Sequence, residues 1–200
     1  THNASADQGG GFCVFNDAAV AARLMQAEWA RLHGRHQPGL LVAVIDLDVH
    51  QGDGTAALFT ANSGIITASI HCEKNFPARK QRSDWDIGLD RDCTDASYLE
   101  AVSQSLDNLL RWYQPELVIY DAGVDIHQQD DLGLLQISTA GVLARDTLVL
   151  QRCRDAGIPV AAVIGGGYQR DLNALTAVHL QLFKAAFAQQ GSGLWREIET

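Results

Sequence analysis

Four short apolar segments are spaced along the chain and predict the strands of a sheet. They span residues 40–47, 65–70, 117–120 and 159–164, and β-branched residues are frequent in them. Their apolar residues are continuous and do not alternate with polar ones. Strands of this kind are typical of a parallel sheet that is covered on both faces.

Segments with helical periodicity lie between the predicted strands. Asn16 and Asp17 are suitable N-cap residues for a helix that continues to about His33. Between the second and third strands, apolar residues recur three or four positions apart and form one face of a helix. The residues of this face are Tyr98, Leu99, Val102, Leu106, Leu109, Leu110 and Tyr113.

Two further helices complete the pattern. Ser138 or Thr139 begins the first of them. Gly157 and Pro159 end it, because glycine commonly follows the last turn and proline cannot continue a helix. The last helix spans roughly residues 171–189. The alternation predicts an α/β fold, a three-layer open parallel sheet with helices on both faces. Residues 75–92 have no clear period, so we expect a long surface loop there.

The composition is that of one globular domain. Of 200 residues, 46% are hydrophobic and 20% are charged, so we expect residues 1–200 to form a single domain with a sizeable core. No apolar run approaches the roughly 20 residues of a membrane span, and no signal segment opens the chain. The chain begins at Thr1 rather than at methionine, so we expect that upstream sequence was lost or left out.

Charge and cysteine content narrow the classes of function. The net charge of -9 disfavours direct binding of nucleic acid and is compatible with a cationic substrate, such as a lysine peptide or a polyamine. No two cysteines form a C-x-x-C pair, so the sequence offers neither a zinc knuckle nor a redox motif. We expect reduced thiols in a cytoplasmic protein. The cysteines are Cys13, Cys72, Cys93 and Cys153.

Polar residues gather where the predicted strands end. In open α/β sheets, ligands bind at the carboxyl ends of the strands, so these residues mark a candidate site. They are Asp46, Asp48, His50 and Asp53 after the first strand, His71 after the second, Asp121 and Asp125 after the third, and Gly165, Gly166, Gly167 and Tyr168 after the fourth.

The spacing of Asp48 and His50 suits a metal site. Side chains two positions apart in an extended segment point to the same side. A carboxylate from another strand, such as Asp125, would complete three protein ligands with one open position, as in catalytic metal sites. His127 is an alternative ligand, because it forms a second Asp-x-His pair with Asp125. Mixed carboxylate and imidazole ligands suit zinc, iron(II) or manganese, and the spacing does not choose among them.

Four motifs resemble those of the histone deacetylase family, within the arginase/deacetylase fold, and most closely its small bacterial and class IV members. They are GGGFCVFND at residues 9–17, IDLDVHQGDG at 45–54, DAGVDIHQQDDLG at 121–133 and IGGGY at 164–168. The motifs occur in the family's order, and the resemblance covers nearly the whole chain. It implies an arginase/deacetylase-like sheet that lacks its first strands. It also implies a zinc-dependent amidohydrolase that deacylates lysine or a related amine.

The resemblance assigns two cation sites. It implies that Asp48, His50 and Asp125 bind Zn²⁺, with Fe²⁺ as the alternative. It also implies a structural K⁺ or Na⁺ site built largely from main-chain oxygens. The residues of that second site are Asp46, Asp48, His50, Ser69 and Ile70.

The resemblance also assigns catalytic and substrate-binding residues. His2 matches the first of two tandem active-site histidines, and Asp46 matches the carboxylate that orients it. Tyr168 matches the tyrosine that donates a hydrogen bond to the substrate carbonyl. The implied substrate channel accepts the stem of an acylated lysine or polyamine. The residues expected to line the channel are Gly11, Phe12, Phe76, Leu132 and Gly166.

Two departures from the family pattern affect the expected activity. Asn3 stands at the position of the second histidine, although that histidine's usual carboxylate partner, Asp53, is retained. An amide cannot accept a proton near neutral pH, so we expect either a loss of about 10²–10⁴-fold in rate or proton transfer by His2 alone. The family's N-terminal portion is also absent, so we expect exposed apolar surface that a partner or a second copy covers.

Two other functions remain open from the sequence. One is a weakly active or inactive relative that binds acyl-lysine or acyl-polyamine, which Asn3 favours. The other is a binuclear ureohydrolase, which shares the fold but would need additional Asp and His ligands on these strands.

Overall fold

The computed structural model describes residues 1–34, 39–59 and 64–189. Its five strands form one parallel sheet in the order β3-β2-β1-β4-β5. The strands are β1 (Val42–Asp46), β2 (Ile65–Cys72), β3 (Trp85–Leu89), β4 (Leu117–Asp121) and β5 (Val160–Val163). The helices are α1 (Asp17–His33), α2 (Asp53–Leu58), α3 (Asp95–Tyr113), α4 (Thr139–Asp155) and α5 (Leu172–Gln189).

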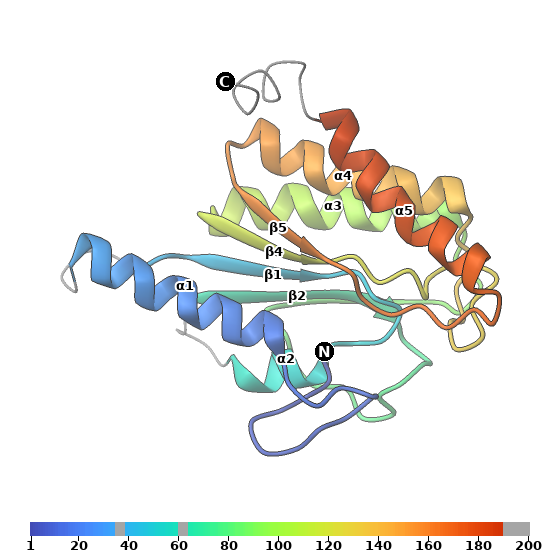
Figure 1. The fold of residues 1–200 in the computed structure, drawn as a ribbon, viewed down its shortest axis with the longest axis horizontal. Helices are drawn as coiled ribbons and strands as arrows, with labels where there is room; N and C mark the ends of the chain where they lie inside the picture. The colour runs from blue at the N-terminus through green and yellow to red at the C-terminus, as the bar shows by residue number, and fades with distance from the viewer. Residues whose placement is uncertain (35–38, 60–63, 190–200) are drawn as a thin grey trace.

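Helices cover both faces of the sheet, so the predicted three-layer α/β architecture is confirmed. In Figure 1, α3, α4 and α5 lie on one face, and α1 and α2 lie on the other. The side chains of β1 alternate between the two layers: Ala43 and Ile45 belong to the larger core cluster, and Val42 and Val44 to the smaller one. Because both faces are buried, the strand reads as a continuous apolar run.

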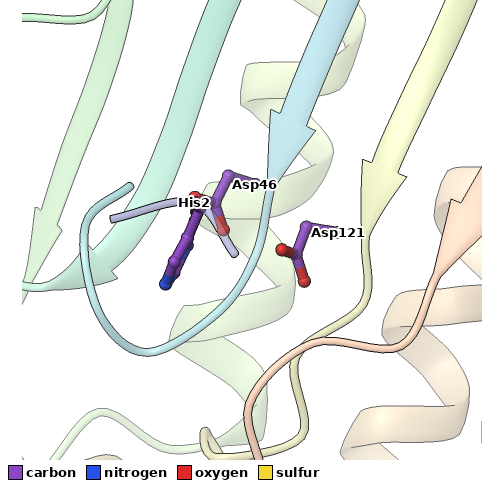
Figure 2. Close-up of side chains that lie close together, drawn as sticks. All are labelled: His2, Asp46 and Asp121. Atoms are coloured by element: carbon purple, nitrogen blue, oxygen red, sulfur yellow. Dashed lines mark hydrogen bonds and ion pairs between the residues drawn. The ribbon is translucent and has the colours of Figure 1, made fainter. Parts of the chain in front are cut away.

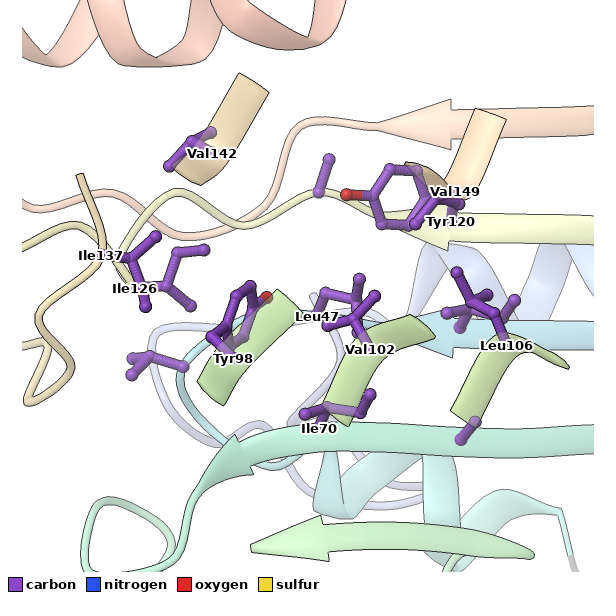
Figure 3. Close-up of a cluster of buried hydrophobic side chains, with 14 of the residues drawn as sticks. Leu47, Ile70, Tyr98, Val102, Leu106, Tyr120, Ile126, Ile137, Val142 and Val149 are labelled. Carbon is purple, nitrogen blue, oxygen red and sulfur yellow. The ribbon is translucent and has the colours of Figure 1, made fainter. Parts of the chain in front are cut away.

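The larger core cluster fixes α3 against the sheet. Its apolar face was expected from the three- and four-residue spacing, and most of that face is buried. Figure 3 shows Tyr98, Val102 and Leu106 of α3 packed with Leu47 and Ile70 from the sheet side. This packing lies next to the ends of β1 and β2, where the candidate site is found.

Helix boundaries follow the expected capping residues. The side-chain Oδ1 of Asn16 accepts a hydrogen bond from Ala19 N at 3.0 Å, and Ser138 Oγ accepts one from Gly141 N at 3.0 Å. After α4, Gly157 has a φ of 70°. Ile158 N donates to Cys153 O at 2.8 Å there. This is a Schellman ending, in which glycine takes the left-handed conformation at low cost.

The sequence prediction was wrong for part of residues 75–92, because this segment contains β3. The strand lies at an edge of the sheet and pairs only with β2 among the described residues. Its side chains alternate between partly buried or buried and exposed, with Asp86 and Gly88 on the exposed positions. Five residues with a polar position and a glycine carry too little periodicity to be recognised. The short helix α2 was also not anticipated.

Among the exposed apolar side chains of the described residues, two groups stand out. One lies around α1 and the loop before it, and the other lies on α5, beside the exposed Ala161 and Ala162 of β5. The exposed residues are Val14, Phe15, Val20 and Leu24 in the first area, and Leu172, Leu180, Phe183 and Phe187 in the second. Within the described part of the chain, no helix is long and apolar enough to cross a membrane.

Candidate metal and catalytic site

The sheet register brings two acidic residues to one edge and one face. Asp46 ends β1 and Asp121 ends β4, and the two are direct partners in the parallel pairing. Side chains alternate along a strand, so Asp46 points to the same side as Val44, and Asp121 to the same side as Ile119. Both therefore point toward the layer that contains α1. The loops that follow carry the remaining polar residues.

Asp48, His50 and Asp125 converge just beyond these strand ends. Their ligand atoms all lie within 4.8 Å of one another, and all three residues are buried. His50 Nδ1 lies 3.1 Å from Asp48 Oδ1 and 3.0 Å from Asp125 Oδ2. Two carboxylates and one imidazole form a donor set that suits Zn²⁺ or Fe²⁺, so the residues present fit the metal that the sequence led us to expect.

His127 does not join this group. Its Nε2 lies 3.1 Å from Thr139 Oγ1, and its Nδ1 accepts a hydrogen bond from Gln129 N at 3.2 Å. Both ring nitrogens are thus engaged away from Asp48 and His50. Of the two ligand sets that the sequence left open, the structure brings together the one with Asp125.

Main-chain N–H groups fix the orientation of both carboxylates. Val49 N donates to Asp125 Oδ1 at 2.8 Å, and Gly166 N donates to Asp48 Oδ2 at 2.8 Å. A side chain at Gly166 would collide with the carboxylates of Asp48 and Asp125. Only glycine therefore allows this backbone to approach the ligands so closely. Partners of this kind hold ligand atoms in place before an ion binds.

The charges within the cluster are strongly coupled. Burial and the nearby charge of Asp48 raise the pKa of Asp125 well above its usual range. Burial alone would lower the pKa of His50, but hydrogen bonds with Asp125 and Asp48 outweigh it and raise the pKa to about 9. The cluster without an ion therefore holds protons at neutral pH. A cation must displace them, so metal binding is expected to weaken as pH falls.

His2 lies beside this cluster and forms a hydrogen-bonded pair with Asp46. His2 Nδ1 is 2.7 Å from Asp46 Oδ2, and His2 Nε2 is 3.7 Å from Asp48 Oδ1. Burial lowers the pKa of His2, but the charges of Asp46 and Asp48 outweigh it and raise the pKa well above its usual value. Since Asp46 is the acceptor at Nδ1, the Nε2 atom is turned toward the cluster.

Asp121 is a third carboxylate at this place, a candidate site residue to which the resemblance assigned no role. Figure 2 shows its carboxylate turned toward Asp46 and His2 from the neighbouring strand, and the three residues have ligand atoms within 4.8 Å. Its side chain is buried, and Oδ1 has no hydrogen-bond partner among the described residues. Burial and the charge of Asp46 raise the pKa of Asp121 to about 7.

The Asp121→Asn variant should therefore be more stable than the wild type at pH 8 when metal is removed by a chelator. A raised pKa stabilises the folded state below the ordinary value of 3.8, and this stabilisation is lost as pH rises through about 7. That difference in pKa corresponds to at most about 4 kcal/mol. Urea unfolding at pH 5 and pH 8 measures the part that is lost between these two pH values, about 3 kcal/mol. A stability difference between the two proteins that does not change with pH would contradict the expectation.

Asn3 is held by two acceptors. Its Nδ2 donates to Asp53 Oδ1 at 2.7 Å and to Gln51 O at 2.8 Å. Because both partners can only accept, the amide orientation is determined, and Oδ1 must face the other way, toward Cys13 Sγ at 4.0 Å. Asn3 thus keeps the contact with Asp53 that the resemblance implies for the second histidine.

A cavity of about 270 Å³ leads to His50. Its aromatic walls include Phe12, whose ring centroid is 6.0 Å from that of Tyr168, and Phe76, 6.3 Å from the His50 ring. Gly166 lies behind the carboxylates and not among these residues, and Asn75 was not anticipated. The cavity is lined by Asn3, Gly11, Phe12, His50, Asn75, Phe76, Leu132 and Tyr168.

Hydrogen bonds between loops shape this cavity. Asn75 Nδ2 donates to Leu132 O at 2.9 Å, which joins two sides of the mouth. Tyr168 N donates to Asp130 Oδ2 at 2.6 Å. A side chain at Gly11, which has a φ of 51°, would collide with Asn3. A larger hollow of about 810 Å³ lies between α1 and the loop before it, away from the acidic clusters.

The residues expected to bind K⁺ or Na⁺ lie close together along the sheet. Asp46 and Ser69 are direct partners in the pairing of β1 with β2, and Ile70 follows Ser69. Ser69 Oγ lies 2.9 Å from His71 Nδ1, so His71 has a structural partner. The monovalent cation site itself stays a prediction.

Comparison with known proteins decides the family. The profile of the histone deacetylase domain matches residues 1–184. The chain belongs to the histone deacetylase family. An uncharacterized protein of Picosynechococcus sp. is 46% identical to this deacetylase-family chain over 188 residues, which cover 93% of the chain and 59% of the relative. Histone deacetylase 2 of Arabidopsis thaliana is 32% identical, with 84% of the chain and 42% of the relative covered.

A solved structure supports the same assignment of fold. Acetylpolyamine aminohydrolase from Burkholderia pseudomallei superimposes with a TM-score of 0.74 at 27% identity, covering 95% of this chain and 54% of that one. The resemblance read from the motifs and the arginase/deacetylase-like sheet are therefore confirmed. The chain spans about half the length of the relatives it matches.

Proposed function

We propose that this histone deacetylase-family chain carries the metal centre of a zinc-dependent amidohydrolase that removes an acyl group from lysine or a polyamine. The observation that carries the proposal is the convergence of Asp48, His50 and Asp125 at the cavity that Phe12 and Phe76 border. Such a cavity admits a thin apolar stem and brings its end to His50. The cavity would therefore orient a substrate at the same place where a metal could act on it.

The donor set limits the choice of metal, and two further side chains would act beside it. Asp48, His50 and Asp125 would hold Zn²⁺, or Fe²⁺ as the alternative. When bound, the cation supplies Lewis-acid chemistry, polarising the amide carbonyl and making water more acidic. The positive charge of a bound cation would favour the neutral form of His2. Neutral His2 would take a proton from the attacking water at Nε2 and return one to the leaving amine, and Asp46 would hold its tautomer.

Tyr168 stabilises the charge that develops on the carbonyl oxygen. Its ring lies 6.1 Å from the His50 ring, on the wall of the cavity. Burial raises the pKa of its hydroxyl, so the group stays protonated and can donate a hydrogen bond. Asn3 cannot transfer a proton, but its Oδ1 offers an acceptor for a substrate N–H.

The chemistry of the cavity favours an acylated primary amine as substrate. The walls include the apolar side chains of Phe12, Phe76 and Leu132. The chain carries a net charge of -9, which attracts a cationic peptide or polyamine. One structural relative is named acetylpolyamine aminohydrolase. The proposal also includes a structural K⁺ or Na⁺ at Asp46 and Ser69, a cytoplasmic location, and a homo-oligomer that covers exposed apolar side chains.

The decisive experiment combines metal analysis with hydrolysis. The purified protein, loaded with Zn²⁺ or Fe²⁺, is assayed on an activated acetyl-lysine substrate and on an acetylated polyamine, with and without a chelator. We expect one metal equivalent and a hydrolysis rate that the chelator removes. A protein that binds no divalent cation would refute the proposal, as would hydrolysis that persists unchanged without metal.

The same experiment separates the alternatives. One bound metal with no turnover, even after Asn3→His, would support a protein that binds acyl-amines without hydrolysing them. Asn3 is the observation that favours this reading. Two bound metals per chain and hydrolysis of a guanidine substrate would support a ureohydrolase, although family membership favours the deacetylase.

Tyr168→Phe should lower kcat by about 10²–10³-fold, the usual loss when one oxyanion donor is removed. The metal content should not change, because no atom of Tyr168 belongs to the donor set. Steady-state kinetics together with metal analysis test this. Phe12→Leu, which alters the same wall without removing a donor, serves as the control and should mainly raise KM. Full activity of the Tyr168→Phe protein would exclude the assigned role.

A further inference from the structure

Arg145 is a buried cation behind the proposed metal site. It projects from α4 into the larger core layer, and its exposed fraction is 0%. The neighbouring positions one turn away on the same helix face are the apolar Val142 and Val149, which Figure 3 shows in the core. A charge at such a position is costly unless several partners compensate for it. The contacts of Arg145 therefore indicate the role for which a buried charge is kept at this position.

The guanidinium of Arg145 binds main-chain carbonyls from two separate loops. Nη1 donates to Leu47 O at 3.2 Å and to Gly123 O at 2.5 Å. Nη2 donates to Ala122 O at 3.3 Å. Leu47 directly precedes Asp48, whereas Ala122 and Gly123 lead to Asp125. One rigid side chain thus joins the loop after β1 to the loop after β4.

These two loops already pack closely against each other. A side chain at Gly123 would collide with Asp48, so the main chain of one loop touches a ligand on the other. Leu47 N also donates to Asp121 O at 3.1 Å. The distance between Asp48 and Asp125 therefore depends on how the two main chains are held, and Arg145 holds both from behind.

A fixed counter-ion orients Arg145. Asp146 Oδ1 accepts from Arg145 Nε at 2.9 Å and from the Tyr120 hydroxyl at 2.6 Å. Neither Arg145 nor Asp146 is exposed to solvent. The planar guanidinium has donors in fixed directions, so binding Asp146 on one side aims the remaining donors at the three carbonyls.

We propose that Arg145 is a positioning residue for the metal site. By binding the carbonyls of Leu47, Ala122 and Gly123, it sets the separation between the loop that carries Asp48 and His50 and the loop that carries Asp125. It touches neither the metal nor the substrate and acts through the main chain. This inference rests on the proposed metal site and adds to it a residue outside the donor set.

The test is the zinc affinity of a variant that loses the carbonyl contacts but keeps a packed core. The triple variant Arg145→Met, Asp146→Leu and Tyr120→Phe replaces the buried ion pair and its hydroxyl partner with apolar groups, an exchange that proteins often tolerate. We expect it to fold and its zinc dissociation constant to rise about 10–100-fold, as when residues that support metal ligands are removed. Competition with a chromophoric chelator measures the constant without any assay of activity.

Two single variants separate positioning from stability. Tyr120→Phe removes the bond to Asp146 but leaves Arg145 on its carbonyls, and Val149→Ala destabilises the same helix elsewhere. Both should lower the urea midpoint and leave the zinc dissociation constant unchanged. If the triple variant does not fold, Arg145→Lys replaces it. Lysine keeps the charge but cannot reach all three carbonyls. The Arg145→Lys variant should therefore bind zinc more weakly than the Val149→Ala variant does.

The outcomes distinguish this inference from the proposed function. If the wild-type protein binds no zinc, both fail together. If it binds zinc and the triple variant binds zinc equally well, Arg145 does not position the ligands and the proposed function is unaffected. Equal zinc affinity of Arg145→Lys and Val149→Ala would overturn the inference in the same way.

Discussion

Replacing Asp125 by alanine is expected to weaken zinc binding by more than about 100-fold and to reduce amide hydrolysis to background. Loss of a group that only supports a ligand costs about 10–100-fold in affinity, and Asp125 is itself in the donor set. Its Oδ2 lies 3.0 Å from His50 Nδ1, and its Oδ1 accepts from Val49 N. The substitution therefore removes one donor and frees the loop that carries another.

This loss should not come from unfolding. Asp125 is completely buried beside the charge of Asp48, and both raise its pKa, so an ionised carboxylate is unfavourable there without a cation. The alanine variant without metal should therefore retain its fold at pH 8. Circular dichroism and urea unfolding in a chelator check this directly. An acidic residue kept in the core for cation binding lowers the stability of the protein without its metal.

A matched control is Asp131→Ala, which removes a carboxylate from the same loop. Asp131 Oδ2 accepts from Arg170 Nε at 2.8 Å and lies outside the acidic clusters. We expect wild-type zinc affinity and near-wild-type hydrolysis from this control. If Asp125→Ala also binds zinc normally, Asp125 is not a ligand, and the proposed centre would have to be assigned again.

The sequence predicted where in the fold the candidate site lies better than it predicted which side chains meet inside it. Polar residues at strand ends follow from parallel topology and from the side-chain period of two, so Asp48 and His50 could be named as candidate ligands before any coordinates, with Asp125 or His127 as the third. The choice between Asp125 and His127 could not be made from spacing, because both follow the same strand. It depends on which side chain the loop turns inward.

The residue roles that could not be predicted from the sequence are those that depend on packing. Asp121 looks like any carboxylate that follows a strand, until the register places it beside Asp46. Arg145 and Asp146 left a visible signal, since they interrupt the stripe formed by Val142 and Val149 on one face of α4. A charged pair in an apolar stripe either lies on the surface or is buried with partners that compensate its charge. Only the fold distinguishes these two cases.

Strand β3 was missed for a related reason. An edge strand has one neighbour and a half-exposed face, so its sequence need not be apolar throughout. Asp86 on this strand accepts a hydrogen bond from Gln51 Nε2 at 2.9 Å. Gln51 in turn accepts from Gln81 N. The strand thus fixes the loop that carries Phe76, although a segment with no clear period gave no sign of it.

Replacing His2 by alanine is expected to lower kcat by about 10²–10⁴-fold, the range that general acid-base catalysis supplies. With Asn3 in place of a second imidazole, His2 is the group beside the proposed metal that can both take and return a proton. Zinc affinity should remain close to that of the wild type, because Asp48, His50 and Asp125 are untouched. Single-turnover rates and zinc competition measure the two effects separately.

The Asn3→His background shows whether the two positions share one task. If a histidine at position 3 takes over proton transfer, removing His2 will cost less in that background than in the wild type, and the two effects will not add. Asp53, which now accepts from Asn3 Nδ2 at 2.7 Å, is positioned to orient the new imidazole. If His2→Ala leaves kcat unchanged in the wild-type background, another group carries the proton, and the pairing of His2 with Asp46 is structural.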